Sequence, residues 1–126
     1  MRALIVDDSR AMRMVIGRIV AGLGVETLFA GNGKEALASL EADGRPDFCL
    51  VDWNMPEMDG LEFVQAVRAA ERWRDLPVLM VTTETEMVQV SRALEAGASE
   101  YVMKPFTADI LREKLDMLGL VPAGGA

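Results

Sequence analysis

Short apolar runs alternate along the chain with longer segments in which apolar residues recur every three to four positions. Five of the short runs are strand-like, at residues 3–6, 25–30, 48–51, 77–81 and 101–103. The first, third and fourth runs are almost wholly apolar, which predicts strands buried on both faces. The intervening segments, such as the one from Met12 to Leu23, show the periodicity of amphipathic helices.

Polar and small residues mark the ends of the predicted helices. Three residues that can cap helix N-termini each stand three positions before a glutamate: Asn32, Asp59 and Thr83. Gly44 and Gly97 are typical of helix C-terminal ends. The last helix is predicted over residues 107–118, followed by a small, flexible tail at 121–126. We therefore expect residues 1–120 to form one domain.

The predicted elements make five strand–helix units. Strands joined by helical crossovers run parallel, with right-handed connections and helices on both faces of the sheet. This pattern predicts an α/β fold, a flavodoxin-like doubly wound (βα)5 domain with strand order 2-1-3-4-5, which is one of the two common orders for such sheets. Ligands of these folds bind beyond the carboxyl ends of the strands, in this case between the first and third strands.

Composition excludes several classes of function. The 126-residue chain has a net charge of −7 and no run of lysine and arginine, so nucleic-acid binding is not expected. The absence of histidine excludes histidine-based catalysis and histidine metal ligands. The one cysteine, Cys49, lies in an apolar run and is expected in the core. The chain shows neither a membrane-spanning segment nor a signal peptide, so we expect a cytoplasmic protein without a membrane partner.

Charged residues gather at the carboxyl ends of the predicted strands. Asp7 and Asp8 follow the first strand and Asp52 follows the third, so the three carboxylates should converge. Clustered carboxylates repel one another, and Lys104, directly after the fifth strand, offsets part of this repulsion. Two net negative charges remain, which one divalent cation balances. An all-oxygen ligand set favours Mg²⁺, or Mn²⁺, over zinc.

Thr82 adds a hydroxyl group at the end of the fourth strand. Carboxylates, a hydrated divalent cation, an ammonium group and a hydroxyl donor together form a phosphoryl-transfer site. The chain lacks the Gly-x-x-x-x-Gly-Lys-Ser/Thr loop of nucleotide-binding proteins. The phosphoryl group must therefore come from elsewhere, and a carboxylate must be its acceptor.

These residues also carry a resemblance. The Asp7-Asp8 pair, Asp52, Thr82 and the Lys104-Pro105 pair resemble the receiver domain of two-component response regulators, over residues 2–119. Several segments look like the single-domain receivers of bacterial chemotaxis in particular: 52–56, 58–60, 77–82, 97–99 and 104–107. The resemblance implies a chain that accepts a phosphoryl group and then changes its affinity for a protein partner.

The resemblance also implies a role for each site residue. Asp52 would be the phosphoacceptor, attacking the phosphohistidine of a sensor histidine kinase. Mg²⁺ would be held by Asp7, Asp8, Asp52 and the backbone carbonyl of Asn54. Thr82 and Lys104 would contact phosphoryl oxygens, and the Lys104–Pro105 peptide bond would be cis. The chain would catalyse only its own phosphorylation and dephosphorylation, so we do not class it as an enzyme.

Further residues are expected to transmit or limit the signal. Movement of Thr82 would make room for Tyr101 and remodel an output face that includes Met87, Met103, Phe106 and Lys114. Asn54 and Glu84 flank the phosphoryl position and are expected to set the lifetime of the phosphoryl group, and Trp53 is expected to form a wall of the site. The fourth helix is predicted to open with Glu86-Met87, where the enteric chemotaxis regulators carry a basic pair.

Three alternatives stay open at this point. Within the response-regulator hypothesis, the partner is the flagellar motor switch or, alternatively, a component of a phosphorelay or cell-cycle pathway, and a phosphatase is a further candidate partner. A Mg²⁺-dependent phosphohydrolase with an aspartyl-phosphate intermediate is the alternative from another class. A flavin-binding protein ranks last, because Asp7 and Asp8 would repel its phosphate.

Overall fold

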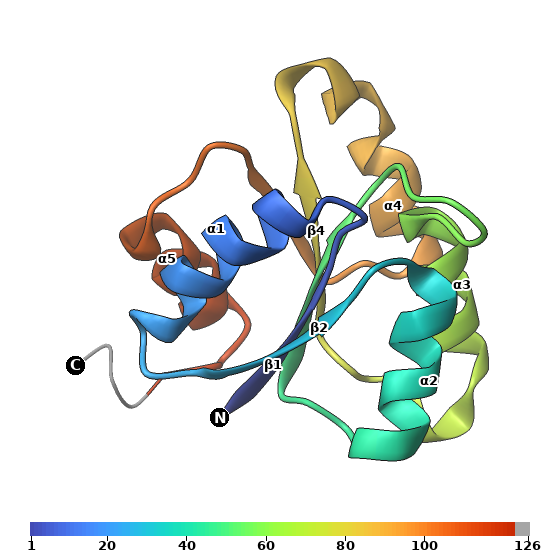
Figure 1. Cartoon of the computed structure of the whole chain (residues 1–126). Coiled ribbons are helices and arrows are strands. Elements are labelled where there is room, and N and C mark those ends of the chain that lie inside the picture. The colour runs from blue at the N-terminus through green and yellow to red at the C-terminus, as the bar shows by residue number, and fades with distance from the viewer. Residues whose placement is uncertain (123–126) are drawn as a thin grey trace.

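The computed structural model describes residues 1–122, which form a five-stranded parallel sheet flanked by helices (Figure 1). The strand order is β2-β1-β3-β4-β5, which confirms the predicted flavodoxin-like topology. Of the predicted tail, Val121 is exposed and Pro122 is buried, and residues 123–126 lie outside the described residues. No helix in the described part of the chain is long and apolar enough to cross a membrane.

The strands lie close to where the apolar runs predict them. Their bounds are β1 Arg2–Val6, β2 Glu26–Ala30, β3 Phe48–Asp52, β4 Val78–Thr82 and β5 Glu100–Met103. The central strands β1, β3 and β4 are buried on both faces, as their apolar sequences predict, whereas the edge strands β2 and β5 carry partly exposed residues. Asp52 and Thr82 are the last residues of β3 and β4.

The helices begin and end largely at the predicted capping residues. Their bounds are α1 Arg10–Ala21, α2 Gly33–Asp43, α3 Gly60–Ala69, α4 Val90–Ala96 and α5 Ala108–Met117, with short 3₁₀ helices η1 Glu71–Trp73 and η2 Glu84–Gln89. Asn32 and Asp59 cap α2 and α3, and Gly97 ends α4 in the left-handed conformation. These boundaries confirm the sequence interpretation.

The start of the fourth helix differs from the prediction. Thr83 and Glu86 form the predicted capping box, but it opens the 3₁₀ helix η2, and α4 begins only at Val90. Met87 therefore lies in η2 and not in α4. The β-branched Thr85 and Val88 lower the α-helical propensity of this segment, which favours the tighter 3₁₀ turn.

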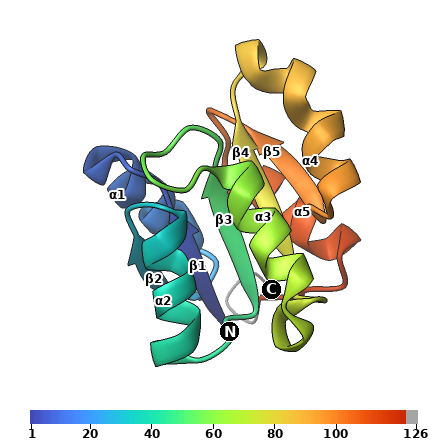
Figure 2. The same ribbon diagram turned by 90° about the vertical axis from the view of Figure 1, so that its right-hand side faces the viewer.

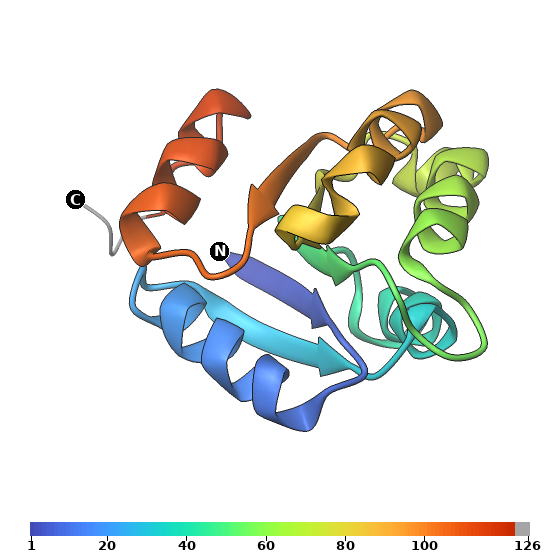
Figure 3. The same ribbon diagram turned by 90° about the horizontal axis from the view of Figure 1, so that it is seen from above.

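The helices cover the two faces of the sheet as separate layers. Helices α1 and α5 lie on one face, and α2, α3 and α4 lie on the other (Figures 1 and 3). Each face has its own apolar core, and strand residues alternate between the two: Leu4 and Val6 point to the second layer, Ala3 and Ile5 to the first. Cys49 is fully buried, as predicted, and burial raises the pKa of its thiol to about 12.

Strand register brings the carboxyl ends of the central strands together (Figure 2). Val6 of β1 pairs with Val51 of β3, so the residues that follow them, Asp7 and Asp52, lie at adjacent strand ends. In the next two pairs, Asp52 lies opposite Val81, and Thr82 lies opposite Met103. All the predicted chemical groups therefore meet at one edge of the sheet.

Candidate functional site

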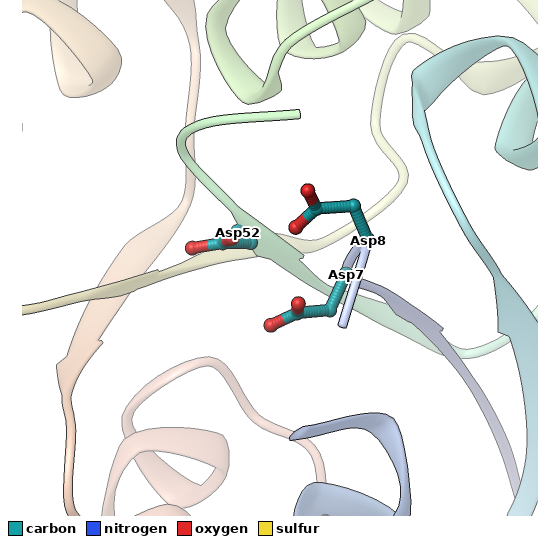
Figure 4. A group of neighbouring side chains, drawn as sticks. All are labelled: Asp7, Asp8 and Asp52. Carbon is teal, nitrogen blue, oxygen red and sulfur yellow. The ribbon is translucent and has the colours of Figure 1, made fainter. Parts of the chain in front are cut away.

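Three carboxylates meet at the carboxyl edge of the sheet. Asp7 and Asp8 lie just beyond β1 and Asp52 ends β3, and each offers an oxygen within 4.8 Å of those of the other two (Figure 4). Asp7 is buried, Asp8 is exposed and Asp52 lies between these extremes. The predicted convergence is thus present, with one side of the cluster open to solvent.

Asp7 is anchored by the backbone around it. Its Oδ1 accepts a hydrogen bond from the backbone N–H of Ser9 (2.9 Å), and its carbonyl oxygen accepts one from the Arg13 guanidinium (2.7 Å). The other carboxylate oxygen, Oδ2, is buried and accepts no hydrogen bond. A buried carboxylate oxygen without a hydrogen bond is costly unless a cation faces it, and here the Lys104 ammonium lies 3.6 Å away, too far for a hydrogen bond.

Lys104 bridges two of the carboxylates. Its Nζ lies 3.4 Å from Asp52 Oδ1 and 3.6 Å from Asp7 Oδ2. The Lys104–Pro105 peptide bond is cis, as predicted. Burial, together with the charge of Asp7, raises the pKa of Asp52 above its usual 3.8, and Lys104 opposes the shift. The ammonium group thus compensates the cluster only in part.

A glycine allows α3 to begin against the Asp52 backbone. A Cβ atom at Gly60 would lie 2.3 Å from the carbonyl oxygen of Asp52, so no other residue fits without displacing the strand end. The backbone N–H of Gly60 donates to the carbonyl of Trp53 (2.9 Å). This close approach holds the end of β3 in place. Trp53, the residue after Asp52, is 4% exposed and packs in the apolar core.

Thr82 lies at the end of β4 with its side chain fully buried. Its hydroxyl donates to the carbonyl oxygen of Thr83 (3.3 Å), and its own carbonyl accepts from the backbone N–H of Lys104 (2.7 Å). The hydroxyl must therefore leave Thr83 before it can donate to a ligand at the strand edge. The predicted switch requires these two arrangements of Thr82, one bonded to Thr83 and one bonded to the ligand.

Asn54 and Glu86 meet across the mouth of the site. The side-chain Nδ2 of Asn54 donates to Glu86 Oε2 (2.8 Å), and this bond links the β3–α3 loop to η2. Glu84, the residue predicted to act with Asn54, is exposed on the same 3₁₀ helix. Sequence patterns give no signal for the Asn54–Glu86 contact, because 32 residues separate the two.

The donor set fits a hard divalent cation. Three carboxylates without histidine or an accessible thiol suit Mg²⁺ or Mn²⁺, whose preferred ligands are oxygen atoms. Asp7 Oδ2 accepts no hydrogen bond and has only the Lys104 ammonium, 3.6 Å away, as a charged partner, so it can also serve as a ligand oxygen. Asp7, Asp8 and Asp52 are therefore the residues that would hold the ion.

The side chains of the predicted output face differ in how far they are exposed. Met103 is 39% exposed, and the Lys114 ammonium lies 4.4 Å from the centre of the half-buried Tyr101 ring and 3.5 Å from Glu100 Oε1. Met87 is half-buried in η2. These residues lie on η2, β5 and α5, and their role in output stays a prediction.

Phe106 does not belong to that surface. It is 8% exposed and packs in the α1/α5 core, so its prediction as part of an exposed output face is wrong. The physical reason is that Phe106 follows the turn after β5 and faces α1. There it lines an apolar pocket of about 290 Å³ beside Lys104 and Pro105.

Two structural arginines were not found from the sequence. Arg13 holds the Asp7 carbonyl, and Arg68 of α3 donates to the carbonyls of Gly97 and Leu76 (both 2.7 Å). Arg68 thereby connects α3 to the loop before β4, at Leu76, and to the end of α4, at Gly97. Arginine contacts with distant carbonyls leave no pattern in the sequence, because they depend on tertiary structure alone.

The fold and the acidic site together fit the receiver class of signalling domain. Residues 3–116 match the family described as the response regulator receiver domain. The match spans most of the chain, and the chain belongs to this family.

Individual relatives narrow the comparison. The chemotaxis protein CheY1 of Helicobacter pylori is 44% identical over 119 residues, which cover 94% of this chain and 96% of the relative. The chemotaxis protein CheY of Pseudomonas aeruginosa is 46% identical over 119 residues, covering 94% and 95%. Among solved structures, the chemotaxis response regulator CheY4 of Vibrio cholerae superimposes with a TM-score of 0.83 at 36% identity, covering 93% of this chain and 97% of that one.

Proposed function

We propose that this protein accepts a phosphoryl group on Asp52 from the phosphohistidine of a sensor histidine kinase and then changes its affinity for a protein partner. The observation that supports this most is the carboxylate cluster, in which buried Asp7 Oδ2 has no hydrogen-bond donor and Lys104 bridges Asp7 and Asp52. Such a site is short of positive charge and open on the side of Asp8. Membership of the receiver family supports the same chemistry.

The transfer step follows from the positions of the side chains. An oxygen of the ionised Asp52 carboxylate attacks phosphorus, a P–O bond forms and the P–N bond to the imidazole breaks, with the electron pair returning to the ring. Mg²⁺, when bound by Asp7, Asp8 and Asp52, neutralises negative charge at the carboxylates and the phosphoryl oxygens.

Lys104 and Thr82 have separate tasks in this step. The Lys104 ammonium, 3.4 Å from Asp52 Oδ1, exchanges part of its contact with the carboxylate for a phosphoryl oxygen. Thr82 gives up its bond to the Thr83 carbonyl and donates to another phosphoryl oxygen. The movement of Thr82 frees space beside β5, where Tyr101 lies half-buried.

Chemotaxis is the pathway that the relatives support. Each relative described above is named as a chemotaxis protein or chemotaxis response regulator, at 44% and 46% identity for the two curated sequences. We propose that the protein acts in the cytoplasm, with a chemotaxis kinase as phosphodonor and the flagellar motor switch as output partner. It catalyses only its own phosphorylation and dephosphorylation, and a phosphorelay partner is the second candidate.

Acetyl phosphate tests the proposal without a kinase. Incubation with acetyl phosphate and Mg²⁺ should label the protein, because the metal and Lys104 activate the acceptor site within this chain. Asp52→Asn should abolish the label, and the control Asp116→Asn, exposed on α5, should keep it. Equal labelling of Asp52→Asn and wild type would remove the assignment. Steady multiple turnover of a phosphomonoester would favour the phosphohydrolase instead.

A further inference from the structure

The carboxylate of Glu86 joins two segments at the mouth of the acidic site. Its Oε1 accepts from the backbone N–H and the Oγ1 hydroxyl of Thr83 (both 3.1 Å), and its Oε2 accepts from Asn54 Nδ2 (2.8 Å). Asn54 stands two residues after Asp52 in the loop that leaves β3. Glu86 is therefore both the capping residue of η2 and the anchor of the Asn54 side chain.

The bond fixes the orientation of the Asn54 amide. An ionised carboxylate only accepts hydrogen bonds, so the amide must turn its Nδ2 toward Glu86. Its carbonyl oxygen Oδ1 then points away from Glu86 as the acceptor end of the group. Without Glu86, the amide of the exposed Asn54 would rotate freely and present donor and acceptor in turn.

We propose that Glu86 is a positioning residue that sets the lifetime of the phosphoryl group on Asp52, by holding Asn54 Oδ1 as an acceptor for the hydrolytic water. The inference rests on the proposed function. In hydrolysis the oxygen of water bonds to phosphorus, and the bond between phosphorus and the Asp52 oxygen breaks. Its electron pair regenerates the carboxylate, and the proton of the water leaves with inorganic phosphate or solvent. Asn54 Oδ1 orients this water by accepting one of its O–H groups.

This role of Glu86 stands beside the one predicted for Glu84. Both glutamates lie in η2, but the hydrogen bond to Asn54 is made by Glu86. Because Glu86 also caps η2 through Thr83, a movement of η2 that carries Glu86 away from the β3–α3 loop would release Asn54. The lifetime of the phosphoryl group is thereby tied to the segment that leads into α4.

Glu86→Gln separates the two contacts of this side chain. Glutamine has one acceptor oxygen, and the Thr83 backbone N–H requires an acceptor that the NH₂ group cannot supply, so the cap keeps the oxygen. The side-chain NH₂ of glutamine then faces Asn54, whose amide must flip and accept through Oδ1. The variant therefore keeps the η2 cap but turns the wrong end of Asn54 toward the water.

Glu62→Gln is the matched control. Glu62 occupies the same place in the capping box of α3, where its Oε1 accepts from the Asp59 backbone N–H (3.1 Å), and within the described residues it makes no hydrogen bond to Asn54. Both variants lose one negative charge and keep a capping oxygen. A change seen in Glu86→Gln and not in Glu62→Gln therefore comes from Asn54.

Two readouts test the proposal. In the metal-free protein, the side-chain NH₂ resonances of Asn54 in ¹⁵N spectra should shift in Glu86→Gln and stay in place in Glu62→Gln. After labelling with acetyl phosphate and Mg²⁺ and removal of the donor, the phosphoryl half-life should lengthen about fivefold in Glu86→Gln, the rate equivalent of about one net hydrogen bond. Asn54→Ala should lengthen the phosphoryl half-life by a similar factor. The half-life in the double variant Asn54→Ala/Glu86→Gln should be no longer than in Asn54→Ala.

The outcomes separate this inference from the proposed function. A half-life unchanged in Glu86→Gln while wild type labels normally would overturn the positioning role of Glu86 and leave the function standing. A half-life that lengthens further in the double variant would show that Glu86 acts apart from Asn54, which also overturns the inference. Failure of wild type to take up label would refute the proposed function and this inference with it.

Discussion

Replacing Asp52 with asparagine should make the protein more stable at neutral pH when no divalent cation is present. The substitution keeps the size of the side chain and removes its charge. Burial and then the charge of Asp7 raise the pKa of Asp52 above 3.8, so the folded protein disfavours the ionised carboxylate. Asparagine relieves that penalty.

The size of the effect follows from the distances in the site. At 4.8 Å, the longest separation in the cluster, two unit charges repel by roughly 3.5 kcal/mol at an effective dielectric constant of about 20. The Lys104 ammonium, 3.4 Å from Asp52 Oδ1, attracts Asp52 by about 5 kcal/mol on the same scale, so it offsets the repulsion from Asp7. Solvent screens the exposed Asp8. Burial, the largest cause of the raised pKa, therefore decides the sign, and we expect Asp52→Asn to gain on the order of 1 kcal/mol of unfolding free energy.

The gain should depend on pH with a definite sign. A carboxyl group whose pKa is raised on folding destabilises the protein above its folded pKa, and the penalty disappears as pH falls toward the unfolded value of 3.8. The advantage of Asp52→Asn over wild type should therefore be full at pH 7 and shrink on acidification toward pH 4.

Urea denaturation in EDTA at pH 7 and at pH 4 measures this difference directly. Asp116→Asn, exposed on α5, is the control and should change stability by no more than a few tenths of a kcal/mol. Added Mg²⁺ should stabilise wild type more than Asp52→Asn, because the variant has lost a ligand. An Asp52→Asn protein no more stable than wild type at pH 7, or a gain that does not shrink toward pH 4, would refute this reasoning.

Three other substitutions test separate parts of the structure. Gly60→Ala places a Cβ 2.3 Å from the Asp52 carbonyl oxygen and should lower the free energy of unfolding by at least about 2 kcal/mol. It should also slow labelling by acetyl phosphate. Wild-type stability in this variant would contradict the close approach. Arg68→Met removes the hydrogen bonds to the Gly97 and Leu76 carbonyls and should lower the free energy of unfolding, measured with urea, by about 3 kcal/mol while labelling persists. The control Arg74→Met, at an exposed position, should change this free energy little. Thr82→Ala should still be labelled but lose most of the phosphorylation-dependent gain in affinity for a partner, about 1–3 kcal/mol by titration calorimetry, and a retained gain would exclude Thr82 from the switch.

The periodic parts of the fold could be predicted from the sequence. The strands are short apolar runs whose burial on both faces requires helices above and below, and this requirement leads directly to a parallel sheet. The carboxylate cluster follows from the same topology, because Asp7 and Asp52 end neighbouring strands. Charge repulsion among them was enough to predict a cation site.

Contacts between loops could not be predicted in the same way. The 3₁₀ helix η2 replaces the predicted first turn of the fourth helix, and it carries Glu86 to Asn54. Phe106 is apolar and lies next to predicted site residues, but only the path of the chain after β5 decides that it faces the α1/α5 core. Such placements depend on tertiary geometry that residue spacing does not encode.

Mapping the acyl phosphate to a residue tests the central claim most directly. The wild-type protein is labelled with acetyl phosphate and Mg²⁺ and reduced with borohydride, which converts a phosphorylated aspartate to homoserine, and the change is located by peptide mass spectrometry. The account predicts homoserine at Asp52 and at neither Asp7 nor Asp8. Homoserine at Asp7 or Asp8, or an unmodified Asp52 in labelled protein, would contradict it.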